Sequence, residues 1–153
     1  MSEYRQPDFS SFDAAVAEAM TTGAKSLGGL PGYLGVSFER FEPGRLVAWM
    51  DVRDDLRTGL GALHGGVMAG LVDHVLGCVL YPLMPRGQWA ATIEFKLNYL
   101  AAVKSGRLRA ESTVLALGRR SAVVRVEVTN DDRLVCTAQG TLLISDPPGA
   151  RGG

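Results

Sequence analysis

The segment LHGGVMAGLVDHVLGCVLY, residues 63 to 81, is apolar almost throughout, yet it carries one carboxylate, Asp73, near its middle. Residues 65 to 81 predict a helix with apolar side chains on all sides of its axis, and such a helix is buried in a core. A sheet of about six strands curled around it would supply that burial. The presence of Asp73 then needs a reason, because a buried charge is costly.

Alternation of apolar and polar residues predicts the strands of that sheet. Residues 33 to 52 predict two strands joined by a turn at Pro43-Gly44. Residues 90 to 145 predict four strands, separated by VKSG, LGRR and NDDR, which we expect to form consecutive hairpins. The residues expected on one buried face are Ile93, Phe95, Leu97 and Tyr99 in the first of these four strands, and Ala122, Val124, Val126 and Val128 in the third.

The two ends of the chain complete the prediction. Residues 9 to 27 show helical spacing, with Ser10 or Ser11 as the cap and the Gly-rich LGGLPG as the end of the helix. The tail, residues 146 to 153, is predicted to be disordered. The order helix, two strands, apolar helix, four strands indicates an α+β protein: one domain over residues 1 to 153, with its core at about 33 to 145.

Composition excludes several kinds of function. The 16 basic and 16 acidic residues balance, which argues against a nucleic-acid or membrane-surface binder. The N-terminus lacks the pattern of a secretory signal, so we expect a soluble, cytoplasmic protein. Cys78 and Cys136 are expected to be buried reduced thiols. His64 and His74 are ten residues apart in sequence and lack the spacing of metal ligands.

The lone acid lies on a stripe of glycines. Gly66, Gly70, Asp73 and Gly77 are spaced by 4, 3 and 4 residues, so they share one face of the predicted helix. Glycine in a helix interior costs about 1 kcal/mol relative to alanine, which indicates close approach of a backbone or a ligand. One interpretation is tight helix packing with Asp73 satisfied by backbone amides. The other is a carboxylate made more basic by desolvation, acting as base or nucleophile.

The triplet His64-Gly65-Gly66 stands where this helix begins. The first amides of a helix lack partners within it, so those near Gly65 and Gly66 can receive an oxyanion. Gly65 and Asp73 are separated by about 12 Å of helix rise, whereas a base and an oxyanion donor must both lie about 3 Å from one reacting centre. Two such helices packed antiparallel across a two-fold axis would satisfy both conditions. We therefore predict an obligate homodimer with shared active sites.

These residues resemble a known family. The spacing H-G-G-V-M-A-G-L-V-D and the following strand TIEFKLNYLAA resemble the hotdog-fold acyl-CoA thioesterases, particularly the branch typified by the phenylacetate-degradation thioesterase. The resemblance implies hydrolysis of an acyl-CoA by dimers often paired into tetramers, without a cofactor, because coenzyme A is part of the substrate. It also implies that Asp73 is the catalytic carboxylate and that the Gly65 amide polarises the carbonyl, with His64 and Gly66 shaping that turn.

Two positions depart from the family pattern. Many relatives have Asn or Gln six residues before the histidine, where this chain has Thr58, and some have Ser or Thr one turn after the acid, where it has Gly77. Thr58 is able to hold a water, whereas Gly77 has no side chain to offer. These departures keep a non-catalytic acyl-thioester-binding dimer open as an alternative. A hotdog dehydratase or hydratase is a weaker alternative, because the usual His-containing signatures are absent.

Further residues are candidates for substrate binding. Coenzyme A carries phosphates that local cations should receive, and basic residues gather in and near one predicted turn: Arg119, Arg120, Lys104 and Arg107. Asn98 and Thr92, on the polar face of their strand, either line the pocket or meet solvent. His74 is expected to be a packed or interfacial histidine. Large apolar residues fit an acyl pocket and core packing equally well: Met68, Leu71, Tyr81, Trp89 and Tyr99. The identity of the acyl group does not follow from residue type.

Overall fold

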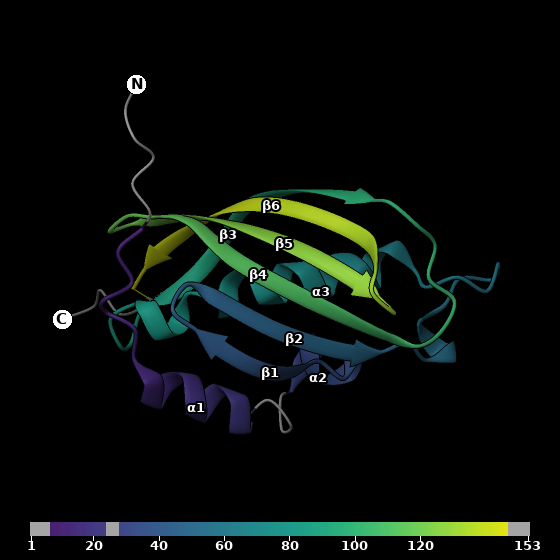
Figure 1. The fold of residues 1–153 in the computed structure, drawn as a ribbon, viewed down its shortest axis with the longest axis horizontal. Coiled ribbons are helices and arrows are strands. Elements are labelled where there is room, and N and C mark those ends of the chain that lie inside the picture. Colours follow the sequence, from purple (N-terminus) through teal and green to yellow (C-terminus); the bar gives the residue numbers. More distant parts are fainter. Residues whose placement is uncertain (1–6, 24–27, 147–153) are drawn as a thin grey trace.

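A six-stranded antiparallel sheet forms the body of the protein. The computed structural model describes residues 7–23 and 28–146, so residues 24–27 of the predicted helix and residues 147–153 of the predicted disordered tail lie outside the described part. Figure 1 shows the sheet curved around helix α3 (Gly65–Cys78), which confirms the predicted α+β arrangement. Along the chain the strands are β1 (Ser37–Glu42), β2 (Arg45–Asp51), β3 (Trp89–Tyr99), β4 (Arg107–Leu117), β5 (Ser121–Asn130) and β6 (Arg133–Ser145).

The strands lie in the order β1-β2-β4-β5-β6-β3, and one predicted hairpin is absent. β1 pairs with β2, β4 with β5 and β5 with β6, as expected. The expected hairpin of β3 with β4 is wrong, because β3 pairs with β6 and β4 with β2. The β3–β4 connection packs against the segment before α3 instead of forming a tight turn. Val103 of this connection is buried, and its carbonyl accepts a hydrogen bond from the Leu63 amide at 2.7 Å. β3 is therefore an outermost strand with one free edge.

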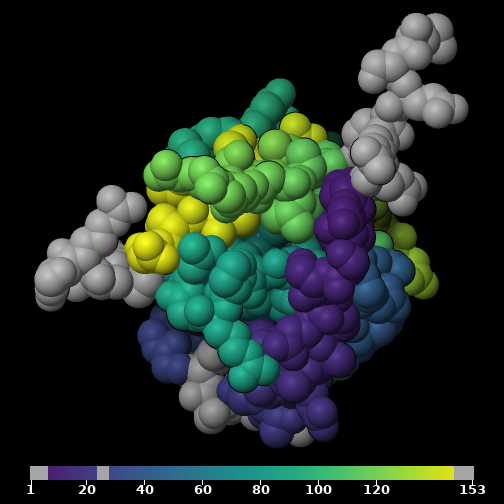
Figure 2. All heavy atoms as spheres, turned by 90° about the vertical axis from the view of Figure 1, so that its left-hand side faces the viewer, coloured from purple at the N-terminus to yellow at the C-terminus, as the bar shows by residue number. Residues whose placement is uncertain are grey.

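Helix α1 (Ala14–Gly23) begins five residues after Phe9, the predicted start. Its cap is Asp13, whose carboxylate accepts hydrogen bonds from two amides of the first turn at 3.0 and 3.1 Å. The prediction of Ser10 or Ser11 as the cap is wrong, since the Ser11 hydroxyl donates instead to a carbonyl in the segment after α3. Figure 2 shows this N-terminal segment, in purple, lying against the teal residues that follow α3.

The stretch LGGLPG does not only end a helix, because most of it forms the unexpected short helix α2 (Gly29–Leu34). Leu34 is buried, and a Cβ placed on Gly70 would lie 3.3 Å from Leu34 and 3.4 Å from Leu30. α2 therefore packs directly on α3. Burial of Leu34 against α3 overrides the weak helix propensity of the Gly- and Pro-rich segment.

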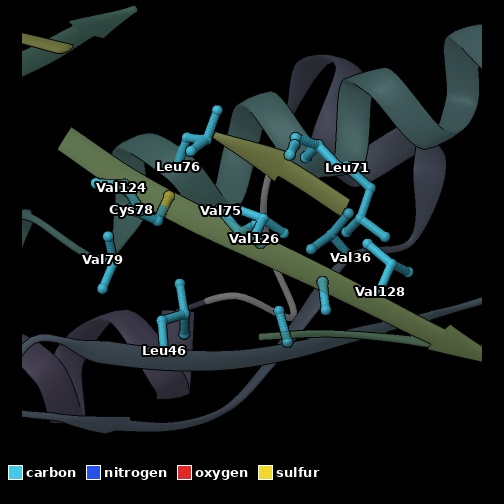
Figure 3. Close-up of a cluster of buried hydrophobic side chains, with 14 of the residues drawn as sticks. Val36, Leu46, Leu71, Val75, Leu76, Cys78, Val79, Val124, Val126 and Val128 are labelled. Atoms are coloured by element: carbon cyan, nitrogen blue, oxygen red, sulfur yellow. The ribbon is translucent and has the colours of Figure 1, made fainter. Parts of the chain in front are cut away.

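Helix α3 buries one side and leaves the other open. Figure 3 shows Leu71, Val75 and Leu76 of α3 beside the valines of β5. The buried residues of α3 are Met68, Leu71, Val72, Val75, Leu76 and Cys78. On the opposite side, Gly66 and Asp73 are exposed. The expectation of a helix buried all round is thus wrong for a single chain, because Gly66 and Asp73 are exposed.

The helix ends at Cys78, three residues before the predicted end. Pro82 lacks the amide that would bond to the Cys78 carbonyl, and the chain continues as a 3₁₀ turn, Tyr81–Leu83. Within the described residues, Gly65–Leu83 is the one segment apolar and long enough to cross a membrane, and 56% of it is buried inside the fold. Burial to this extent is typical of a core helix.

The predicted alternation holds in β5, but β3 departs from it at two residues of its expected buried face, Ile93 and Tyr99, the second of which is 58% exposed. The alternate residues of β5 from Ala122 to Val128 are buried, as expected. In β3, Ile93 is 62% exposed, because the pairing with β6 shifts by one residue between Thr92 and Glu94. The bulge turns Ile93 out of the core face. Both cysteines are buried and unpaired with each other, which confirms the expectation of free thiols.

Candidate active site

The first turn of α3 has one amide that the protein leaves unused. His64 is the N-cap, with φ −66° and ψ 135°, and its Nδ1 accepts a hydrogen bond from the Gly66 amide at 2.9 Å. The Val67 and Met68 amides donate to the His64 carbonyl at 3.0 and 3.4 Å. In the part of the chain that the structure describes, the Gly65 amide has no acceptor. The donor at the positive end of the helix is therefore Gly65.

The carbonyl of Gly65 is held by the last residue of β3. The Tyr99 hydroxyl donates a hydrogen bond to this carbonyl oxygen at 2.8 Å. A Cβ on Gly65 would lie 2.9 Å from the same hydroxyl, so the close approach requires glycine. The sequence suggests Tyr99 only as a pocket or core residue, because nothing local links positions that are 34 residues apart.

An apolar hollow of about 410 Å³ opens beside Gly65. It lies between the first turn of α3 and the end of β3, and its walls carry no ionisable group except the Tyr99 phenol. The lining residues are Ala62, Leu63, Gly65, Met68, Tyr99, Leu100, Ala101, Ala102 and Val103. This hollow can take an uncharged group whose carbonyl reaches the Gly65 amide. Of the suggested pocket residues, Met68 and Tyr99 line it.

Asp73 lies on the open side of α3, as its spacing with the glycines predicts. Its side chain is exposed and makes no hydrogen bond or ion pair with any residue that the structure describes. Satisfaction of Asp73 by backbone amides is therefore not found. The two neighbouring glycines differ: Gly70 faces the leucines of α2, whereas a Cβ on Gly77 would meet only Leu142, at 4.0 Å. Space for a second molecule thus remains around Asp73 and Gly77.

Comparisons with known proteins agree on one family. Residues 60–137 match the model of the thioesterase superfamily. The proofreading thioesterase EntH of Klebsiella pneumoniae is 31% identical over 114 residues, which are 73% of this chain and 83% of that protein. The chain belongs to the thioesterase superfamily. The expected resemblance to thioesterases is thereby confirmed.

Two further comparisons show similar proteins. The 1,4-dihydroxy-2-naphthoyl-CoA hydrolase of Escherichia coli is 28% identical over 118 residues, 76% of this chain and 87% of that protein. A phenylacetic acid degradation-related protein from Ralstonia eutropha superposes with a TM-score of 0.76 over 82% of this chain and 97% of its own, at 23% identity. That likeness supports the hotdog fold expected from the sequence.

The remaining residues near the helix are engaged in packing. Thr58 shapes the turn before the helix, since its hydroxyl accepts a hydrogen bond from the Leu60 amide at 3.3 Å. His74 stacks on Phe38 at 5.5 Å between ring centroids and lies 3.6 Å from the Cys78 sulfur. Burial lowers the pKa of His74 and raises the pKa of Cys78 to about 12. The expectation of a packed histidine is confirmed.

Three residues that the sequence predicts to bind substrate lie away from Gly65. By alternation Asn98 is on the opposite face of β3 from Tyr99, and it does not line the hollow. Arg119 and Arg120 lie in the turn between β4 and β5 and border a separate polar hollow of about 310 Å³. Arg107, also suggested for phosphate binding, is already paired with Asp51 at 2.8 Å.

Metal chemistry has no visible basis in the residues that the structure describes. A metal site requires at least three ligand side chains close together. Within residues 7–23 and 28–146, no three His, Cys, Asp or Glu side chains form such a cluster. The arrangement offers instead a single backbone donor, an apolar hollow and an unpaired carboxylate. Such groups suit acyl transfer to water, in which the donor binds the developing oxyanion and the carboxylate handles the nucleophile.

Proposed function

We propose that this protein hydrolyses acyl-CoA thioesters at a site shared between two protomers. The Gly65 amide of one protomer would polarise the thioester carbonyl, and Asp73 of the other would act as general base or nucleophile. The observation that carries the proposal is the single unpaired amide, at Gly65, on the same helix as an exposed and unpaired carboxylate. Coenzyme A belongs to the substrate, so no cofactor is required.

The reaction adds water across the C–S bond. As a general base, Asp73 takes a proton from a water molecule while that water attacks the carbonyl carbon. As a nucleophile, Asp73 attacks the carbonyl carbon itself, and water hydrolyses the resulting anhydride in a second step. The oxygen becomes negative and is stabilised by the Gly65 amide. Collapse of this intermediate breaks the C–S bond, and the thiolate of coenzyme A leaves and takes up a proton. The products are the free acid and coenzyme A.

Two features support the dimer. Gly65 and Asp73 of one chain are about 12 Å apart along the helix, which is too far for one reacting centre. Among the residues that the structure describes, β3, with 11 residues, pairs only with β6 and leaves its other edge open, and edge strands readily pair with another chain. Antiparallel pairing of two β3 strands about a two-fold axis would turn the two glycine stripes toward each other. Pairing of such dimers into a tetramer remains part of the proposal.

The phosphates of coenzyme A need cations at some distance from the thioester. Arg119 and Arg120 are exposed and make no ion pair with any residue that the structure describes, so both are available for this role. We expect Arg120→Ala to raise the KM for an acyl-CoA and to leave the KM for a short thioester without the nucleotide unchanged. An equal effect on both substrates would argue against this role.

The activity is tested by thiol release from a panel of aliphatic and aromatic acyl-CoA substrates. The wild-type protein should hydrolyse at least one of them, and Asp73→Asn, which preserves shape but removes the base, should reduce kcat by about 100- to 10,000-fold. Circular dichroism on the same preparations controls for folding. Turnover by a folded Asp73→Asn variant at the wild-type rate would refute the assignment of Asp73, and no turnover of any substrate would leave only a binding protein.

A further inference from the structure

The peptide group between Gly65 and Gly66 is held at both ends by side chains. Its oxygen accepts a hydrogen bond from the Tyr99 hydroxyl at 2.8 Å, and its N–H donates one to Nδ1 of His64 at 2.9 Å. The unused Gly65 N–H belongs to the preceding peptide group, which joins His64 to Gly65. Two consecutive glycines otherwise have the widest conformational freedom of any dipeptide, so these two contacts limit the directions in which the Gly65 N–H can point.

We propose that Tyr99 is a positioning residue for the oxyanion donor, an inference that rests on the proposed thioesterase site. Its hydroxyl fixes the first turn of α3, so that the Gly65 amide is aimed at the substrate carbonyl before the reaction begins. A donor fixed in advance stabilises the developing charge without reorganising, which is the main source of its effect. A donor free to turn loses part of that stabilisation.

The position of Tyr99 in the fold suits this role. Its backbone is fixed by the sheet, where it pairs with Cys136 of β6. Its side chain reaches the Gly65 carbonyl, and both residues form part of the wall of the apolar hollow. The hydroxyl is occupied by the Gly65 carbonyl, so it is not available to bind the acyl group unless it gives up this bond. The aromatic ring remains free to contact the acyl group.

Tyr99→Phe tests this role, because it removes the hydroxyl and keeps the ring. If Tyr99 acts through the oxyanion donor, kcat should fall about five- to tenfold, as expected for one neutral hydrogen bond, while KM stays within about twofold. A residue that only lines the pocket would instead raise KM. Tyr33→Phe is a matched control, since Tyr33 is 59% exposed against 58% for Tyr99, and its hydroxyl bonds to Asp55 rather than to α3.

A double substitution supplies a second readout. Gly65→Ala places a methyl group 2.9 Å from the Tyr99 hydroxyl and should displace it, so its loss of kcat should resemble that of Tyr99→Phe. The double variant should then be no slower than either single variant, because the two changes remove the same contact. Additive losses in the double variant would overturn the role of Tyr99 but not the proposed function. So would a Tyr99→Phe variant that keeps the wild-type kcat while Asp73→Asn is inactive. Absence of turnover in every preparation would overturn the proposed function as well.

Discussion

At the scale of single residues, the question is which amide of the first turn receives the oxyanion. The sequence offers both Gly65 and Gly66. The structure distinguishes them, because the Gly66 amide is occupied by the imidazole of His64 and the Gly65 amide is not. The sequence shows a histidine before two glycines, but not the direction of its side chain. From the resemblance, His64 is expected only to shape the turn. In the structure its side chain caps the helix by accepting the hydrogen bond of the Gly66 amide.

Replacement of Gly65 by proline should remove this donor selectively. Gly65 is the first residue of α3, a position that favours proline, and the φ −66° and ψ 135° of His64 suit a residue before proline. We expect Gly65→Pro to fold and to lose about 100- to 1,000-fold in kcat. Gly65→Ala is the control, since it makes the same contact with Tyr99 but keeps the N–H. Equal activity of the two variants in the thiol-release assay would exclude this amide as the donor.

At the scale of elements, the sheet carries a closed ring of charges on its outer face. Alternating Arg and Glu side chains of β1, β2 and β4 pair in sequence around Val47, which is fully buried although it is not part of the main hydrophobic cluster. The stems of the long side chains cover this valine. The members of the ring are Arg40, Glu39, Arg109, Glu111, Arg45 and Glu42.

Glu111 gives this ring a predictable dependence on pH. The hydrogen bond from Arg45, at 2.8 Å, holds the pKa of the Glu111 carboxyl below its ordinary value. A carboxyl with a lower pKa in the folded state stabilises the fold above the pKa of the unfolded chain, and that stability is lost as the pH falls through the folded-state pKa. Glu111→Gln should therefore cost about 0.5 to 1 kcal/mol of unfolding free energy near neutral pH and much less in acid.

Urea denaturation of wild type and Glu111→Gln at about pH 7 and about pH 3 measures this difference. Glu18→Gln is a suitable control, because Glu18 is exposed on α1 and makes no ion pair with any described residue. The control should show no comparable dependence. A Glu111→Gln difference that persisted undiminished in acid would mean that packing around Val47, rather than the charge of Glu111, stabilises this part of the sheet.

The elements differ in how far the sequence predicts them. The stripe of Gly66, Gly70, Asp73 and Gly77 follows from helical spacing alone, and the structure confirms it. The position of β3 at the edge does not follow, because strand order depends on contacts between distant segments, such as the bond of Leu63 to the β3–β4 connection. α2 is unexpected for a similar reason, since its leucines are stabilised by a glycine on another helix.

At the scale of the whole molecule, the open edge of β3 and the open side of α3 lie on the same unpartnered part of a single chain. Ile93 and Leu100, at and just beyond this edge, are 62% and 52% exposed, so apolar side chains are available there to a partner. Asp73 is solvated in one protomer. In the proposed dimer, the partner and the substrate would cover this carboxylate and exclude water from it. Assembly and catalysis are therefore expected to depend on each other.

A mixture of two inactive variants tests this dependence. In a heterodimer of one Asp73→Asn protomer and one Gly65→Pro protomer, one site combines both defects, whereas the other combines an intact Asp73 with an intact Gly65 from opposite chains. Purified through two different tags, this heterodimer should recover about half of the wild-type activity per dimer, while each parent homodimer stays inactive. If each chain contained a complete site, both sites of the heterodimer would carry a defect, and mixing would restore nothing.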